Sequence, residues 1–342
     1  MVGNVFADAS FKVNILNTNY AFKDSVKITP TEFSGRNIKI HDLEGHNGTA
    51  TVSVHHEHFK NMNYRLQVDA NNMLVYNTKE TPDLQFYGTV YGTGNASLVG
   101  DSNGINIDVA MKTNRNTNFV YMLTTTTSAV NNQFVTFVDK TPKRKIEEDS
   151  TVVADYFLQN MVKETTNSSS DVHLNMSIDA TPDATMKIVV DPIANDYIIG
   201  KGSGNMRMEY YNKGDIKMFG NYSIDHGTYK FSLQEVIRKD FSINSGSTVT
   251  FNGDPLNANL DIKAKYTVNS VSLSDLGSEV PEDLKKSNVK VNCLMDITGN
   301  MLHPTVKLGI ELPNESEEKQ RIVQNVISTE DQINMQTLYI LS

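Results

Sequence analysis

Apolar and polar side chains alternate over long stretches of this chain, above all between residues 200 and 266. Met206, Met208 and Tyr210 fall on one face of an extended segment, and Arg207 and Glu209 fall on the other. A period of two residues is that of a β-strand, in which successive side chains point to opposite faces of the sheet. This region therefore predicts several strands that share one apolar face.

The same pattern covers most of the chain, with glycine-containing turns at intervals of roughly 8–12 residues. Thr, Ser, Asn, Val, Ile and Tyr dominate it, which is typical of strands joined by short turns. Upstream, the predicted strands are Thr49–His58, Tyr64–Asp69, Leu84–Tyr91, Ala96–Val99, Ile105–Met111, Phe119–Thr124 and Phe134–Val138. The chain is therefore expected to be all-β.

A change of composition divides the chain into three predicted parts. Residues 1–140 form an upstream β-repeat segment, residues 141–171 a linker or insertion, and residues 172–342 a C-terminal β domain. The middle part has a basic run, an acidic run, a possible helix over residues 149–163 and a Ser-rich tract, as loops and insertions often do. A second helix is predicted at about residues 315–328, and residues 338–342 are expected to begin a strand.

A short glycine motif occurs twice. Gly92-Thr-Gly94-Asn95 and Gly202-Ser-Gly204-Asn205 are each followed by a strand, a turn and another strand. Repeated hairpins that share one apolar face predict an elongated sheet rather than a closed propeller blade.

Charge and composition exclude some classes of protein. The net charge of −9 makes nucleic-acid binding improbable, since the only dense basic run, Lys140 to Lys145, is followed at once by acidic residues. The single cysteine, Cys293, rules out an intramolecular disulfide and alternates with apolar residues like a buried strand position. No apolar run is long enough for a membrane-spanning helix, and the first residues lack the pattern of a secretory signal. The opening, VGNVFADASFKVN, instead resembles the middle of a strand array, so the chain is expected to be part of a longer protein.

Candidate chemistry is sparse. His55, His56 and His58 invite a metal-site interpretation, but no third ligand with suitable spacing accompanies the two that would share a strand face. The Gly-x-Gly pairs lack the third glycine and following helix of a dinucleotide site. Asp191 and Asp196 have no His or Ser partner nearby in the sequence, which favours turn formation over catalysis. We therefore expect no enzyme activity, no metal and no cofactor.

Several longer strings resemble one known family. IVVDP, GKGSGNM, GDIKMFGNYSIDHGTYKFSL and KDFSINSGSTVTFNGDPLNANLDIKAKY, between residues 188 and 266, are similar to the C-terminal domain of the TamB family in the form seen in the Bacteroidota. PTVKLGIELP at residues 304–313 and the acidic helix after it extend the resemblance. It covers residues 170–342 well, whereas residues 1–140 match only the general style of the family's upstream strand repeats.

The resemblance implies a fold and a function. The fold is an elongated, curved antiparallel β-sheet groove of repeated hairpins, described as β-taco-like, with one or two short helices including one near the C-terminus. The function is that of a non-catalytic periplasmic protein of the cell envelope, anchored in the inner membrane by a segment outside this chain. Its groove conducts phospholipid between the inner and outer membranes, with a BamA-like outer-membrane barrel (TamA-like) as partner. An older interpretation of the family is a scaffold for outer-membrane protein assembly or secretion.

The apolar strand faces supply the predicted groove lining. Periodicity alone favours an ordinary packed core, and it is the resemblance that favours a groove at least partly open. If the groove is instead plugged by the predicted C-terminal helix, Ile322 and Val326 would be the plug. The predicted lining residues are Met206, Met208, Tyr210, Ile216, Met218, Tyr222, Ile224, Tyr229, Phe231, Leu233, Phe241, Ile243, Val249, Phe251, Leu260, Ile262, Ala264, Tyr266, Val306, Leu308 and Ile310.

Overall fold

One sheet of 17 strands forms most of the molecule in the computed structural model. The structure describes residues 2–81, 86–123, 170–233, 237–272, 274, 280, 282–286 and 288–342. The elements are β1 (Gly3–Val13), η1 (Asn14–Leu16), β2 (Thr18–Ile28), β3 (Glu32–Asp42), β4 (Asn47–Glu57), β5 (Lys60–Thr78), β6 (Phe86–Gly100), β7 (Gly104–Thr113), β8 (Asn118–Met122), β9 (Asp171–Ala180), β10 (Thr185–Asp191), β11 (Asp196–Tyr211), β12 (Lys217–Leu233), β13 (Ile237–Ile243), β14 (Ser247–Gly253), η3 (Pro255–Asn257), β15 (Asn259–Ser272), α2 (Glu282–Lys285), β16 (Asn288–Asn300), β17 (Thr305–Glu311), α3 (Glu317–Val326) and α4 (Glu330–Leu341).

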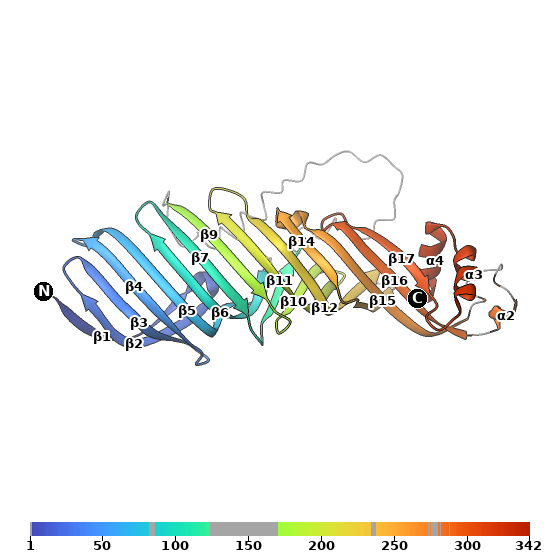
Figure 1. Ribbon diagram of the computed structural model, residues 1–342, viewed down its shortest axis with the longest axis horizontal. Helices are drawn as coiled ribbons and strands as arrows, with labels where there is room; N and C mark the ends of the chain where they lie inside the picture. Colours follow the sequence, from blue (N-terminus) through green and yellow to red (C-terminus); the bar gives the residue numbers. More distant parts are fainter. Residues whose placement is uncertain are drawn as a thin grey trace.

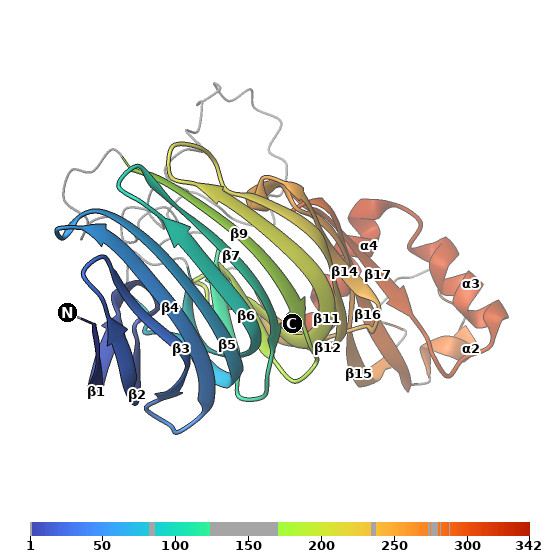
Figure 2. The same ribbon diagram turned by 60° about the vertical axis from the view of Figure 1, so that its left-hand side comes forward.

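The sheet is bent along its length into an elongated trough. Figure 1 shows the strands following one another from β1 at the N-terminal end to β17, beside which the helices lie. The turned view of Figure 2 shows that the sheet is curled, with further strands behind β6, β7 and β9. The trough therefore has two walls that meet along a bend.

Long strands run through the bend and hold the two walls together. β6 pairs with β7 over one half and with β8 over the other, and β11 does the same with β9 and β10. β12 and β15 likewise each pair with both β14 and β13. We call β7, β9, β14 and the parts of long strands paired with them the first wall, and β8, β10, β13 and their paired parts the second wall.

Two pairings in the middle of the trough are parallel. β7 pairs with β9, and β8 with β10, in parallel, whereas the other strand pairs are antiparallel. The expected sheet was antiparallel throughout. Parallel neighbours need a long connection, and here residues 123–170 lie between β8 and β9.

The repeated glycine motif lies at the bend of β6 and of β11. A Cβ atom on Gly94 would lie 2.1 Å from the carbonyl oxygen of Ala110, and one on Gly204 would lie 2.2 Å from that of Asn221. Gly220 of β12, opposite Met206, has φ of +123°, and a Cβ there would lie 2.2 Å from the carbonyl oxygen of Asn205. Only glycine fits where neighbouring backbones come this close, so the motif marks the bend.

Polar side chains satisfy backbone groups where the ladder is interrupted. At the junction of β7 and β8, the Thr117 hydroxyl accepts from the Tyr91 N–H (3.0 Å) and donates to the Tyr91 carbonyl (3.2 Å). Between β13 and β14, Ser247 Oγ accepts from the N–H of Lys263 on β15 (3.1 Å). Because an unpaired buried backbone group is costly, these hydroxyls are part of the sheet.

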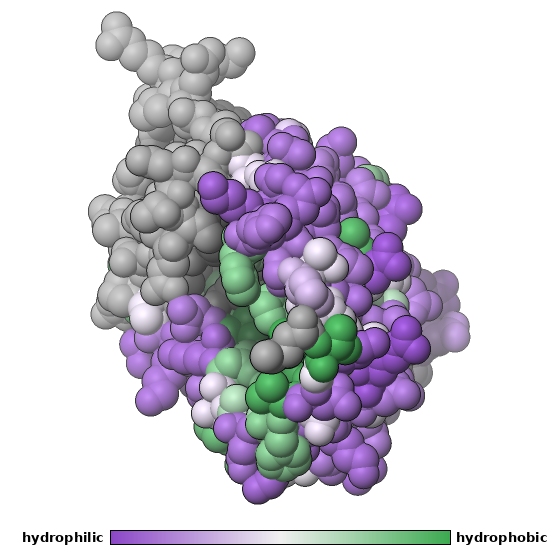
Figure 3. All heavy atoms as spheres, turned by 90° about the vertical axis from the view of Figure 1, so that its left-hand side faces the viewer, coloured by the Kyte–Doolittle hydropathy of each residue, from purple (hydrophilic) through white to green (hydrophobic). Residues whose placement is uncertain are grey.

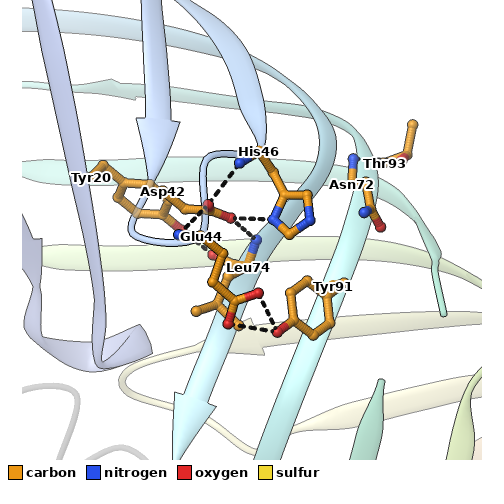
Figure 4. A network of polar contacts seen from close by, with 8 residues as sticks. All are labelled: Tyr20, Asp42, Glu44, His46, Asn72, Leu74, Tyr91 and Thr93. Atoms are coloured by element: carbon orange, nitrogen blue, oxygen red, sulfur yellow. Dashed lines mark hydrogen bonds and ion pairs between the residues drawn. The ribbon is translucent and has the colours of Figure 1, made fainter. Parts of the chain in front are cut away.

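Near the N-terminal end, a buried carboxylate accepts hydrogen bonds from backbone groups that the sheet leaves unpaired (Figure 4). Asp42, which ends β3, accepts from the N–H of Leu74 at 2.8 Å and from the N–H and Nδ1 of His46 at 2.9 and 3.0 Å. Burial acts to raise the pKa of Asp42, but the hydrogen bonds from Leu74 and His46 outweigh it and hold the pKa below its ordinary value. In the same turn, the Glu44 carboxylate accepts from the Tyr91 hydroxyl at 2.8 Å.

The C-terminal third of the trough is packed shut. Phe241, Ile262 and Met295 are almost fully buried in a core that joins β12 to β16. Leu341 of α4 is buried in this core. Val323 of α3 is buried in a second, smaller core beside β16. The helices therefore cover the end of the sheet.

Most of the predicted architecture is confirmed. The chain is mostly β, the sheet is elongated and curved, and α3 falls inside the predicted helix at 315–328. The predicted strand at 338–342 is wrong: these residues end α4, whose capping box at Thr329 and Gln332 starts the helix. The predicted strand Phe134–Val138 and the possible helix over 149–163 lie outside the described residues. The three-part division stays a prediction.

In the part of the chain that the structure describes, no helix combines the length and the apolar character needed to cross a membrane.

Asp196, at the start of β11, is buried among the strands of the second wall. It is 5% exposed, and its Oδ1 has no hydrogen-bond partner among the described residues. Burial raises the pKa of Asp196 to about 7, although a hydrogen bond from the Ser232 backbone opposes this, and the charge of Asp191 raises it further. The carboxyl is therefore neutral in the folded chain at mildly acidic pH.

Replacing Gly204 is expected to destabilise the fold. The Cβ of Gly204→Ala would meet the β12 backbone at 2.2 Å, which forces the strands apart and costs about 2–3 kcal/mol of unfolding free energy. Gly214→Ala is the matched control, because its Cβ would meet nothing closer than 3.4 Å. Urea denaturation of both variants measures the difference, and equal midpoints would contradict the close approach.

Asp196→Asn is expected to stabilise the fold in a pH-dependent way. The folded chain keeps the Asp196 proton up to about pH 7, whereas the unfolded chain releases it near 3.8, so wild-type stability falls as pH rises between these values. Asn cannot ionise, so the variant's advantage grows from near zero at about pH 4 to at most about 4 kcal/mol above pH 7. Urea denaturation across this range, with the exposed Asp225→Asn as control, measures the gain. A gain that did not change with pH would contradict the assignment.

Candidate binding trough

A large apolar cavity lies between the two walls. Its volume is about 1240 Å³, and its lining residues come from β1 through β12, from β14 and from η3. Figure 3 looks at the N-terminal end and shows apolar residues inside a hollow, surrounded by a hydrophilic outer surface. Phe11, Val13 and Leu16 line the cavity at this end, and Leu256 and Met301 line it toward the packed core. The cavity thus follows the trough for most of its described length.

Alternation within each strand produces this apolar surface. On β9, Met176 and Ile178 line the cavity while Asn175 and Ser177 are exposed on the outer face. Because the period is two, the strands give the cavity mostly apolar positions. The inner surface of the trough is therefore mostly apolar, and its outer surface is polar.

The two walls differ in chemistry. The first wall carries methionines, among them Met176, Met208 and Met218. The second wall carries aromatic rings: Phe86 stacks on Tyr121 with centroids 4.7 Å apart, and Phe119 lies 5.8 Å from Phe86. A flexible wall thus faces a more rigid one.

Two tyrosines on the cavity wall use their hydroxyls within the sheet. The hydroxyl of Tyr20 donates to the Leu74 carbonyl and that of Tyr76 to the Phe86 carbonyl, both at 2.9 Å, which leaves their rings as apolar surface. Among the described lining residues, charged side chains occur only at Asp215, Lys217 and Asp254. All three lie at the ends of β12 and β14, beside the β11–β12 turn.

The structure places the predicted lining residues in two groups. The first group lines the cavity: Met206, Met208, Ile216, Met218, Tyr222, Val249 and Phe251. The second group belongs to packed clusters or lies against them: Tyr210, Ile224, Tyr229, Phe231, Phe241, Ile243, Leu260, Ile262, Ala264, Tyr266, Val306, Leu308 and Ile310. The side chain of Leu233 lies outside the described residues. A role in lipid binding stays a prediction for every residue of the set.

The two groups meet in the packed core: Met206, Tyr222 and Val249 of the first group are buried members of it where it borders the cavity. Ile262 of β15 is 1% exposed within this core, whereas Met208 of the first wall is half-buried and faces the cavity. Neither Ile322 nor Val326 lies on the described cavity wall; both pack against the smaller core. The helices therefore close the end of the sheet without filling the cavity.

Sequence reasoning missed the upstream half of the lining. Leu66, Val68 and Met73 of β5 and Phe86 and Val90 of β6 contribute as much wall as the downstream strands. Their alternation is visible in the sequence, but a bulge between Ala70 and Met73 shifts the inward positions from even to odd. A strict period of two breaks at that point, which hides the continuity of the face.

A second, much smaller cavity of about 20 Å³ lies beyond the large one. Ile188 and Met301 line both, so these two side chains lie between the open trough and the packed core. Met301 is held in place by its N–H, which donates to the Ala258 carbonyl at 2.8 Å.

The histidine-rich segment forms an aromatic cluster. His56 is 4% exposed and stacks on Phe59 with centroids 4.7 Å apart, and Phe33 lies 4.8 Å from His56 and 6.1 Å from Phe59. β4 ends at Glu57, so His58 lies in the following turn and does not share a strand face with His56. Within the described ranges, no group of three or more His, Cys, Asp and Glu side chains is placed to hold a metal ion.

Cys293 is a core residue of β16, as predicted. It is fully buried, and burial raises the pKa of its thiol to about 12. A thiol with so high a pKa stays protonated and unreactive near neutral pH.

Comparison with known proteins agrees with this geometry. The family model of the TamB C-terminal domain matches residues 36–334, and its match begins well upstream of residue 170, where the resemblance in the sequence becomes strong. Among curated proteins, no significant match is found. Since the family model covers most of the chain, the chain belongs to the TamB C-terminal domain family and is a cell-envelope protein of the TamB type.

Proposed function

We propose that this chain is a non-catalytic conduit that carries the acyl chains of phospholipids along its trough. The observation that carries the proposal is the cavity of about 1240 Å³, lined by apolar side chains from successive strands of one bent sheet. Such a cavity exceeds the roughly 300–1000 Å³ typical of a site for one small ligand. It has the form of a path rather than of a pocket.

The energetics of lipid transfer favour such a path. At about 0.8 kcal/mol per methylene group, exposing an acyl chain of roughly 16 carbons to water costs more than 10 kcal/mol. An apolar wall that continues from strand to strand removes this cost at each position. Neighbouring strands are about 4.8 Å apart, so an acyl chain always contacts several of them.

The same wall favours movement over trapping. Tyr20 and Tyr76 use their hydroxyls on backbone carbonyls, so these groups offer no strong fixed bond to a ligand. Methionine side chains adapt to different shapes at little energetic cost. Affinity is then similar along the trough, which lets a bound chain slide.

The setting of this activity is also proposed. Membership of the TamB family supports transfer between the inner and outer membranes across the periplasm, with a BamA-like outer-membrane barrel as partner and an anchor in the inner membrane. These parts of the proposal come from the family and not from the described residues.

A scaffold for outer-membrane protein assembly is the second candidate. β1 pairs with β2, and no strand in the described ranges pairs with its other edge. A free strand edge can accept an added strand from another protein. Transfer of lipid and pairing of strands would use different surfaces, the cavity wall and the edge, so one experiment can separate them.

Charged substitutions on the cavity wall are expected to weaken acyl-chain binding. Met208→Asp places a carboxylate against the bound chain, and we expect at least tenfold weaker binding of a fluorescent fatty acid, equivalent to about 1.4 kcal/mol. Ser177→Asp, on the outer face of the neighbouring strand, is the control and keeps wild-type affinity. Circular dichroism and urea midpoints confirm that both variants fold.

Photo-crosslinking in cells tests the function itself. A photoreactive residue at position 176, inside the trough, is expected to capture phospholipid, whereas one at position 177, on the outer face, is not. A photoreactive residue on the free edge of β1 tests the scaffold. Capture of nascent outer-membrane proteins at β1, without lipid at position 176, would overturn the conduit.

A further inference from the structure

Methionine is concentrated on the cavity wall. The chain has 14 methionines, and eight of them line the cavity: Met73, Met111, Met176, Met186, Met206, Met208, Met218 and Met301. Elsewhere, Met62 and Met335 are exposed on the outside at 42% and 67%, and Met122 and Met295 are buried off the cavity wall. The chain thus holds methionines in three distinct environments.

Three of the cavity methionines form a row across neighbouring strands. Met208 of β11 lies directly opposite Met176 of β9 on one side and Met218 of β12 on the other. Side chains that face each other across paired strands have Cβ atoms about 5 Å apart. All three are half-buried, so they form part of the surface that a ligand would contact. We call them the methionine row.

The neighbours of the row on β7, β9 and β11 are apolar, whereas Lys217, next to Met218 at the start of β12, is a charged residue of the cavity wall. Val109 of β7 lies opposite Met176, and Ile178 of β9 lies opposite Met206 of β11. None of these apolar side chains can donate a hydrogen bond. A polar atom introduced into the row would therefore find no side-chain donor among the neighbours on β7, β9 and β11.

We propose that the methionine row is an oxidation site that decides whether the trough holds an acyl chain. The inference rests on the proposed function, since it assumes that acyl chains lie against the row. Oxidation converts a flexible apolar thioether into a polar sulfoxide. Three sulfoxides in a line would interrupt the apolar wall where it crosses β9, β11 and β12.

The chemistry requires a peroxide as the oxidant. Hydrogen peroxide transfers one oxygen atom to the methionine sulfur: an S–O bond forms, the O–O bond breaks, and the second oxygen leaves as water. The sulfur loses two electrons and the peroxide gains them. Methionine sulfoxide reductases, one for each sulfoxide epimer, reverse the change.

A bound acyl chain and oxidation oppose each other at this site. The chain covers the sulfur atoms and excludes peroxide, while a sulfoxide oxygen placed against an acyl chain loses its hydrogen bonds to water without replacement. Oxidation is then faster in the empty trough, and the oxidised trough binds less.

The test begins with peptide mass spectrometry of the purified protein after hydrogen peroxide, with and without saturating oleate. Met62 and Met335 serve as exposed references, and Met122 and Met295 as buried ones. We expect the row to be oxidised after the exposed pair and before the buried pair, and at least fivefold more slowly when oleate is present. Oxidation of the row no earlier than Met122 and Met295, or at a rate unaffected by oleate, would overturn the inference.

Binding of a fluorescent fatty acid is then measured before and after peroxide. The wild type is expected to lose at least tenfold in affinity and to regain it after treatment with both sulfoxide reductases. A triple variant, Met176→Leu, Met208→Leu and Met218→Leu, conserves volume. Its affinity is measured before and after the same peroxide treatment, and the two values are expected to differ by less than twofold, whatever the starting affinity. Equal loss in the triple variant, or no loss in the wild type, refutes the role of the row.

The two proposals fail in different ways. If untreated wild type binds no fatty acid, the conduit itself is wrong and the inference falls with it. If untreated protein binds and the fully oxidised row binds equally well, the conduit stands and only the oxidation site is wrong.

Discussion

The structure depends on how one sheet can bend sharply and still satisfy its backbone hydrogen bonds. A bend pulls some N–H and C=O groups away from their ladder partners, and buried groups without partners are costly. This chain meets the constraint in two ways. Glycines such as Gly94 and Gly204 let neighbouring strands approach closely. Side chains such as Thr117, Ser247 and Asp42 accept hydrogen bonds from backbone N–H groups that have no partner in the ladder. Without both, the walls could not face each other across a cavity.

One sequence pattern thus produces two different interiors. Strands with alternating apolar residues line an open cavity in the N-terminal two-thirds and a packed core in the C-terminal third. The difference depends on whether other side chains pack against the apolar face of the strand. Met208 faces the cavity between two separated walls, whereas Ile262 faces side chains from β12, β13 and β16, and α4 covers the end of that core. Openness is therefore a property of tertiary arrangement and not of any single strand.

This explains how far the sequence could be interpreted. Its period of two predicts the strands and the elongated sheet, and a helix near residues 315–328 follows from the spacing of Ile322, Val323, Val326 and Ile327. The pattern of Phe231 is the same as that of Met208, so local sequence could not distinguish a core residue from a cavity residue. The last residues, rich in β-formers, are helical because the capping box at Thr329 fixes the start of α4 and Leu341 finds a buried position. Local propensity gave way to tertiary packing.

The parallel seam in the middle of the trough has a mechanical consequence. There, β7 and β9 of the first wall continue into β8 and β10 of the second through loops 114–117 and 181–184, and not as unbroken strands. Across the seam, Thr181 donates two hydrogen bonds of 2.9 Å, from its N–H to the Thr113 hydroxyl and from its hydroxyl to the Thr113 carbonyl. The Thr185 N–H donates to the Thr117 carbonyl at 2.8 Å. Hydrogen bonds between loops yield more readily than a strand with ladders on both sides. A change in the angle between the walls at this seam would therefore strain bonds between loops and not unbroken strands, as it would where β13 passes into β14 through residues 244–246.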